Sequence, residues 1–134
     1  MYKMKKEDTM KYKLYQIHLT DAEYDKVNAE GHNSVPKHMM KLDMGIGFGK
    51  KINHIAEKAL ELGYYTHVSN ITADNLEKVF EVGNIGPEEN IERLAPMFSV
   101  SVGDVVEDPA GKKFVVASFG FEEISGGIGF EEVA

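Results

Sequence analysis

Alternating hydrophobic and polar residues predict a set of β-strands along the chain. In 11–19 (KYKLYQIHL) the alternation indicates a strand that is at least partly covered on both faces. The stretch 64–71 (YYTHVSNI), rich in aromatic and β-branched residues, predicts a second strand. Near the end, 104–107 and 113–118 predict an antiparallel hairpin, because 108–111 (DPAG) has the composition of a tight turn. We expect the first strand to join the sheet of this hairpin, since two strands alone are marginal in water.

Helices are predicted where apolar residues recur at helical spacing. The segment 20–23 (TDAE) is a capping box that begins a short helix, which we expect to end near Asn28. The following stretch, 29–49, is polar and then rich in Met and Gly, and is predicted to be a long loop.

Three further helices are predicted in the middle of the chain. Lys50 to Leu62 has one apolar stripe, and Gly63 is well placed to end that helix. Thr72 is expected to cap the next helix and Gly83 to close it, and 86–87 (GP) to begin a short further one. In the helix that follows Thr72, we expect Leu76, Val79 and Phe80 to face inward.

This order of elements predicts a single α+β domain over residues 10–124. Its core is a small, mainly antiparallel sheet with a C-terminal β-hairpin, covered by two to four helices. We expect the stripe of the 50–62 helix to cover the hairpin face that carries Val116. Residues 1–9 are predicted to be an N-terminal extension, and residues 125–134 a flexible acidic tail.

Composition narrows the classes of function. The 134 residues include no cysteine, which excludes disulfides, thiolate zinc sites and a cysteine nucleophile. The net charge of −7 and the single arginine, Arg93, argue against nucleic acid as a partner. No apolar run approaches the roughly 18 residues of a membrane span, and the lysine-rich start is not a secretory signal. We therefore expect a cytoplasmic protein with no membrane association.

One loop carries a candidate ligand site, formed by Gly45, Gly47, Gly49, Lys50 and Lys51. Glycines allow a backbone to approach a phosphate closely, and the amides that begin the following helix attract anions. The spacing matches neither of the common phosphate-binding motifs, and no hydroxyl follows the lysines to hold magnesium. A small-molecule or nucleotide/phosphate-binding domain is therefore the alternative hypothesis.

No pattern predicts catalysis. The histidines lack metal-ligand spacing, and no serine stands in a nucleophile elbow. The paired glutamates suit a helix start or a solvated tail. We accordingly predict no catalytic residue, no metal site and no cofactor. The five histidines are His18, His32, His38, His54 and His67.

The C-terminal third resembles a known family. The segments 98–108 (FSVSVGDVVED) and 114–124 (FVVASFGFEEI) are similar to the end of YodL-like domains, although Gly103 replaces the serine of that family. The chain also resembles small proteins of marine T4-type bacteriophages, which begin near MKYKLYQIHLTD and contain VGNIGPE and ERLAPM. These resemblances imply a phage accessory protein that acts by binding a host or phage macromolecule, with a protein as the expected partner. They imply no catalytic site.

Overall fold

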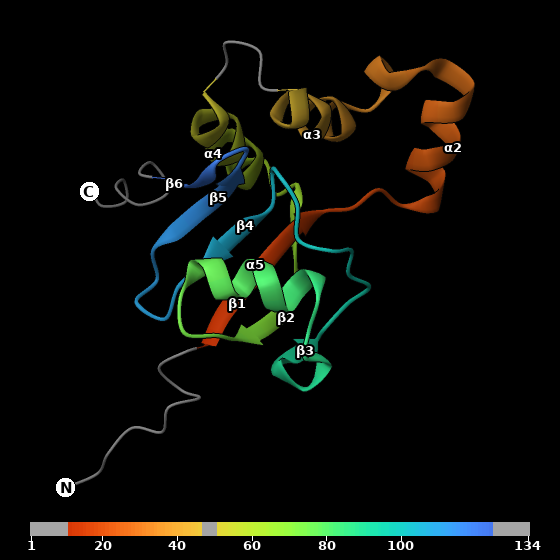
Figure 1. Ribbon diagram of the computed structural model, residues 1–134. Coiled ribbons are helices and arrows are strands. Elements are labelled where there is room, and N and C mark those ends of the chain that lie inside the picture. The colour runs from red at the N-terminus through yellow and green to blue at the C-terminus, as the bar shows by residue number, and fades with distance from the viewer. Residues whose placement is uncertain (1–10, 47–50, 125–134) are drawn as a thin grey trace, which may run out of the picture.

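The computed structural model describes residues 11–46 and 51–124, and over these ranges it shows one antiparallel sheet with helices on both faces (Figure 1). The order of the six described strands across the sheet is β3-β2-β1-β4-β5-β6. The strands are β1 (Lys11–Ile17), β2 (Tyr65–Thr72), β3 (Ile91–Arg93), β4 (Val105–Glu107), β5 (Lys113–Ala117) and β6 (Gly120–Glu123). The helices of the described ranges are α2 (Asp21–Glu30), α3 (Pro36–Ile46), α4 (Ile52–Glu61) and α5 (Leu76–Asn84), with the 3₁₀ turns η1 (His32–Ser34) and η2 (Glu88–Asn90). The predicted α+β class is confirmed, whereas the predicted extension 1–9 and tail 125–134 lie outside the described residues.

The first strand joins the sheet of the hairpin, as predicted, and lies near its centre. β1 pairs with β2 on one side and with β4 on the other, and both pairings are antiparallel. Its two faces reach different cores, since Leu14 packs into one hydrophobic cluster and Ile17 into the other. The predicted hairpin is also confirmed, because β4 pairs with β5 across a turn in which Gly111 N donates to the Asp108 carbonyl at 2.9 Å.

Helices cover the two faces of the sheet with separate cores. On the face that α5 covers, Val79, Val82 and Val116 are buried, and we call this cluster the α5-side core. On the face that α4 covers, Ala56, Ala59 and Val115 are buried, and we call this cluster the α4-side core. The expectation that the 50–62 helix covers the face with Val116 is therefore wrong. Successive residues of a strand point to opposite faces, and it is the preceding valine that faces α4.

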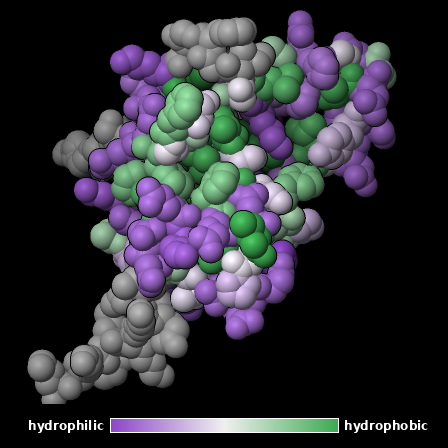
Figure 2. Space-filling model, in the orientation of Figure 1, coloured by the Kyte–Doolittle hydropathy of each residue, from purple (hydrophilic) through white to green (hydrophobic). Residues whose placement is uncertain are grey.

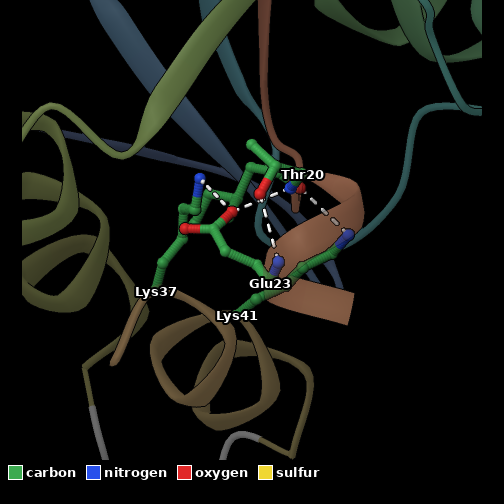
Figure 3. Close-up of polar contacts among 5 residues, drawn as sticks. Thr20, Glu23, Lys37 and Lys41 are labelled. Carbon is green, nitrogen blue, oxygen red and sulfur yellow. Dashed lines mark hydrogen bonds and ion pairs between the residues drawn. The ribbon is translucent and has the colours of Figure 1, made fainter. Parts of the chain in front are cut away.

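The capping box that begins α2 is confirmed. Thr20 Oγ1 accepts a hydrogen bond from Glu23 N at 3.1 Å, and Glu23 Oε1 accepts one from Thr20 N at 2.8 Å. Glu23 also pairs with Lys37 Nζ at 3.0 Å, which ties α2 to α3 (Figure 3). No residue of α2 is buried, and the helix stands away from the sheet (Figure 1). Gly31, with φ of 98°, ends it.

The predicted long loop 29–49 is wrong over its described part. The chain there forms η1 and then the eleven-residue helix α3. Pro36 occupies the first position of α3, where its fixed φ is favourable. Met40 and Met44 lie one turn apart and both pack against the α4-side core, with Met44 only 1% exposed. These two methionines therefore lie on one face of a helix.

Helix α5 begins and packs differently from the prediction. Thr72 belongs to β2, and the side chain of Asn75 caps the helix. Gly83 lies within α5 and does not close it. Phe80, expected to face inward, is 42% exposed, while Val82 points into the core. The helix is therefore rotated so that one aromatic ring remains at the surface.

The last third contains two strands that the pattern did not predict. β3 pairs with β2. β6 pairs with β5 after the chain reverses, and its first residue, Gly120, has a φ of 89°, which favours glycine. The residues 99–102 are irregular, although they alternate serine and valine as a strand would. Phe119, at the reversal before β6, is 96% exposed and adds nothing to the core.

Candidate functional site

The predicted glycine and lysine site is not a loop throughout. Gly45 lies in the last turn of α3, so its expected place in an irregular phosphate-binding loop is wrong. Gly47, Gly49 and Lys50 lie outside the described residues. Lys51 is the residue before α4 and is exposed, with an extended backbone and no side-chain capping bond.

A pocket of about 460 Å³ lies beside Lys51. The start of α4 contributes Lys51, Asn53 and His54 to its wall, and the β5–β6 hairpin contributes Ser118 and Glu122. The pocket thus joins two segments that are far apart in the sequence.

The charges of this pocket suit a mixed polar ligand better than a phosphate. Lys51 supplies a positive charge, but the Glu122 carboxylate in the same wall repels anions. Asn53 Oδ1 is buried and accepts no hydrogen bond from the described residues, and its Nδ2 reaches the Glu123 carbonyl at 3.5 Å. A ligand with a hydrogen-bond donor would satisfy that oxygen.

The histidines do not gather in one group, although two of them contact each other. His18 Nε2 lies 3.0 Å from Gln16 Oε1, and His67 Nε2 lies 2.9 Å from Asn70 Oδ1. His32 and His38 contact each other, with Nδ1 of the first 3.0 Å from Nε2 of the second. Over residues 11–46 and 51–124, no three His, Cys, Asp or Glu side chains gather in a metal-binding group.

A buried polar cluster ties β1 to the irregular segment that precedes β4. Gln16 is 2% exposed and Asp104 is 5% exposed. Gln16 Nε2 donates to Asp104 Oδ2 at 3.0 Å and to the Phe98 carbonyl at 2.9 Å, while Phe98 N donates to Gln16 Oε1 at 3.0 Å. Ser101 N donates to the same Asp104 oxygen at 2.9 Å. The cluster fixes the backbone of residues 98–104.

Burial sets the electrostatics of this cluster. Desolvation raises the pKa of Asp104 to about 7, although its two hydrogen-bond donors and the charge of Lys41 act in the opposite direction. Tyr65 Oη donates to the Gly103 carbonyl at 2.6 Å, and burial, then the charge of Asp104, raises the pKa of its phenol. Because these groups bond to one another and to backbone, we assign them a structural role.

A groove lies between α5 and the β5–β6 hairpin. It consists of two adjoining hollows, of about 340 and 560 Å³, which share Phe121 in their walls. Leu76 and Phe80 line it from α5, and Phe114, Val116 and Phe121 line it from the sheet. We call this feature the α5–β6 groove.

The groove exists because one helix cannot cover this face of the sheet. Six strands at a spacing of about 4.8 Å extend over roughly 24 Å, whereas a helix with its side chains is about 10 Å wide. α5 has only nine residues and lies in front of the sheet (Figure 1). Figure 2, which shows this face, has hydrophobic surface near its middle, bordered by hydrophilic side chains.

Two acidic side chains line the groove. Glu77 and Asp108 line it, and neither forms an ion pair with the described residues. Tyr12 lies on the floor, where burial and then the charges of Asp108 and Asp74 raise the pKa of its phenol. The groove therefore combines apolar side chains with two carboxylates that have no cationic partner among the described residues, although Asp108 Oδ1 accepts hydrogen bonds from Ala110 N and Lys112 N.

Sequence reasoning missed this groove, although part of its signal is present. Leu76 and Phe80 are four residues apart and so lie on one face of a helix. The pattern does not show, however, that part of this helix face lies beyond the residues that pack against the sheet. Phe121 follows the predicted hairpin and was not assigned to a strand. Only the tertiary arrangement brings these rings together.

Among the described residues, no helix has the length and apolar character needed to cross a bilayer. Comparisons of the chain with protein-family models, with curated proteins and with solved structures gave no match.

Proposed function

We propose that the chain is a phage accessory protein that acts by binding a host or phage macromolecule, and that the α5–β6 groove is its binding surface. The resemblance of 98–108 and 114–124 to YodL-like domains supports a phage origin. The groove supports a binding role, because exposed apolar surface with a polar border is typical of interaction sites. On this proposal the protein works in the cytoplasm of the infected bacterium.

The chemistry of the groove favours, as its partner, a protein segment with apolar side chains next to Lys or Arg. Phe80, Phe114 and Phe121 offer apolar contact area, which a partner's hydrophobic side chains would bury. Glu77 and Asp108 offer charges that basic residues would pair with. Nucleic acid does not fit, since its phosphates would be repelled by these carboxylates and by the net charge of −7.

A capture experiment with matched variants tests this proposal. The protein and its Phe80→Asp and Ile85→Asp variants would be used to isolate proteins from a bacterial host lysate. Both side chains are exposed, but Phe80 lines the groove and Ile85, 84% exposed, does not. We expect a protein that is retained by the parent and by Ile85→Asp and lost with Phe80→Asp. A partner retained equally by all three, or no partner at all, would contradict the proposal.

The alternative, a small-molecule or nucleotide/phosphate-binding domain, would use the pocket beside Lys51, where the lysine attracts anions although Glu122 opposes them. Its supporting observation is the buried Asn53 oxygen without a donor among the described residues. A ligand that binds the folded state raises the melting temperature by linkage. We would screen nucleotides and phosphates by thermal shift and repeat any positive result with Lys50→Ala/Lys51→Ala. This alternative predicts a shift that the double variant abolishes.

A further inference from the structure

Two imidazole rings meet where α2 and η1 join α3. His32 belongs to η1 and His38 to the first turns of α3, six residues later. Nδ1 of His32 lies 3.0 Å from Nε2 of His38, and the ring centroids are 5.1 Å apart. The contact is at the surface, so both rings are accessible from solvent.

We propose that His32 and His38 form a binding site for a divalent transition-metal ion such as Zn²⁺ or Ni²⁺. Imidazole nitrogens are good ligands for these ions and bind Zn²⁺ at about 2.1 Å. Two nitrogens 3.0 Å apart are reached by one such ion at an N–metal–N angle of about 90°. Opening the pair by roughly 0.4 Å gives the tetrahedral angle that Zn²⁺ prefers, which exposed side chains allow by small rotations. Water would complete the coordination.

Two lysines, Lys37 and Lys41, lie near this position, and the charge of Lys41 acts on His38. Lys37, next to His38 in the sequence, is paired with Glu23 at 3.0 Å, so part of its positive charge is compensated. Lys41, one turn further along α3, donates to the Ile17 carbonyl at 3.1 Å and lies over the Phe98 ring. Its ammonium is therefore held toward the sheet.

A bound ion would have a structural consequence. It would link η1 to α3 and so restrain α2, a helix that buries no residue of its own. We therefore expect metal binding to slow hydrogen exchange in α2, in addition to raising the melting temperature. This site is separate from the α5–β6 groove, and its test is independent of the proposed function.

Calorimetric titration of the tag-free full chain with ZnCl₂ and with NiCl₂ tests the proposal. We expect one ion per chain, and affinity weakened about tenfold or more by His32→Ala or by His38→Ala. The double variant should bind no more tightly than either single variant, because it also lacks the one imidazole that each single variant keeps. His54→Ala, which removes an exposed histidine from α4, serves as the control and should bind as the parent does.

Two results would overturn the site. One is the absence of binding by the parent up to about 1 mM metal. The other is binding that neither His32→Ala nor His38→Ala weakens, which would place the ion elsewhere. Both substituted side chains are at the surface, so circular dichroism should show that the variants remain folded.

Discussion

The side-chain amide of Gln16 donates a hydrogen bond to the Asp104 carboxylate at 3.0 Å, with both residues almost completely buried. The two residues are 88 positions apart, so the bond joins the central strand to the segment before β4. Burial raises the pKa of Asp104 to about 7, from an ordinary value of 3.8. The folded protein therefore holds this proton more tightly than the unfolded chain does.

This proton uptake predicts a stability that falls as pH rises from about 4 to about 7. In that range the folded state binds more protons than the unfolded state, and the full difference corresponds to roughly 4 kcal/mol as an upper value. Asp104→Asn keeps an oxygen for Gln16 and Ser101 but cannot ionise. Urea unfolding should show the variant gaining stability relative to the parent as pH rises. A difference that does not change between pH 4 and pH 8 would contradict the assignment.

Gly83 should not tolerate a side chain. A Cβ atom built there would lie 2.2 Å from Val100 Cγ2, and Val100 is 2% exposed. We expect Gly83→Ala to reduce the free energy of unfolding by about 1–3 kcal/mol, because overpacking forces neighbouring atoms to shift. Val100→Ala removes the clashing methyl groups, so the double variant should lose less than the sum of the single losses. Additive losses would show that the two sites do not touch.

A charged side chain in place of either buried valine of β5 should unfold the protein. Val115 is fully buried and Val116 is 2% exposed, and they face different cores. We expect Val115→Asp and Val116→Asp each to unfold the domain, since an unpaired buried carboxylate is costly. Phe119→Asp is the control, because that side chain is 96% exposed and should leave the circular dichroism spectrum unchanged. A folded Val116→Asp protein would disprove the α5-side core.

Loss of a helix cap should have different consequences at α2 and α5. Thr20→Ala removes the capping box of a helix with no buried residue, whereas Asn75→Ala removes the cap of a helix that buries Val79 and Val82. Each cap is worth about 1 kcal/mol. We expect Thr20→Ala to speed hydrogen exchange in α2 alone, and Asn75→Ala to lower the urea midpoint of the whole domain. Equal global losses would mean that α2 is part of the cooperative core.

Local patterns predicted the elements whose signals are complete within a few residues. The capping box at Thr20 and the turn 108–111 specify their own geometry through hydrogen bonds and φ, so both appeared as expected. Helix α3 was missed because its glycine and methionine content suggested a loop, although Pro36 and the Met40–Met44 spacing favour a helix. Local composition outweighed periodicity in that interpretation.

Tertiary features were beyond the reach of the pattern. Alternation shows that Val115 and Val116 face opposite ways, but not which helix covers each face. Likewise, the prediction that Phe80 faces inward assumed that a wide stripe of α5 is buried. The α5–β6 groove depends on how much of the sheet one short helix covers, which no local signal states. Gly45 lies in a helix and not in the expected loop, because α3 extends through it.

Site-specific photo-crosslinking tests the binding surface most directly. Benzoylphenylalanine would replace Phe80 in the groove wall or, as the control, Ile85 at the end of the same helix. In bacterial host cells the account predicts an adduct from position 80 that is absent from position 85. Mass spectrometry should place the crosslink in a protein segment with apolar residues beside Lys or Arg, and Glu77→Lys should reduce its yield. No adduct at position 80, equal adducts at both positions, or a crosslink to nucleic acid or to an acidic segment would contradict it.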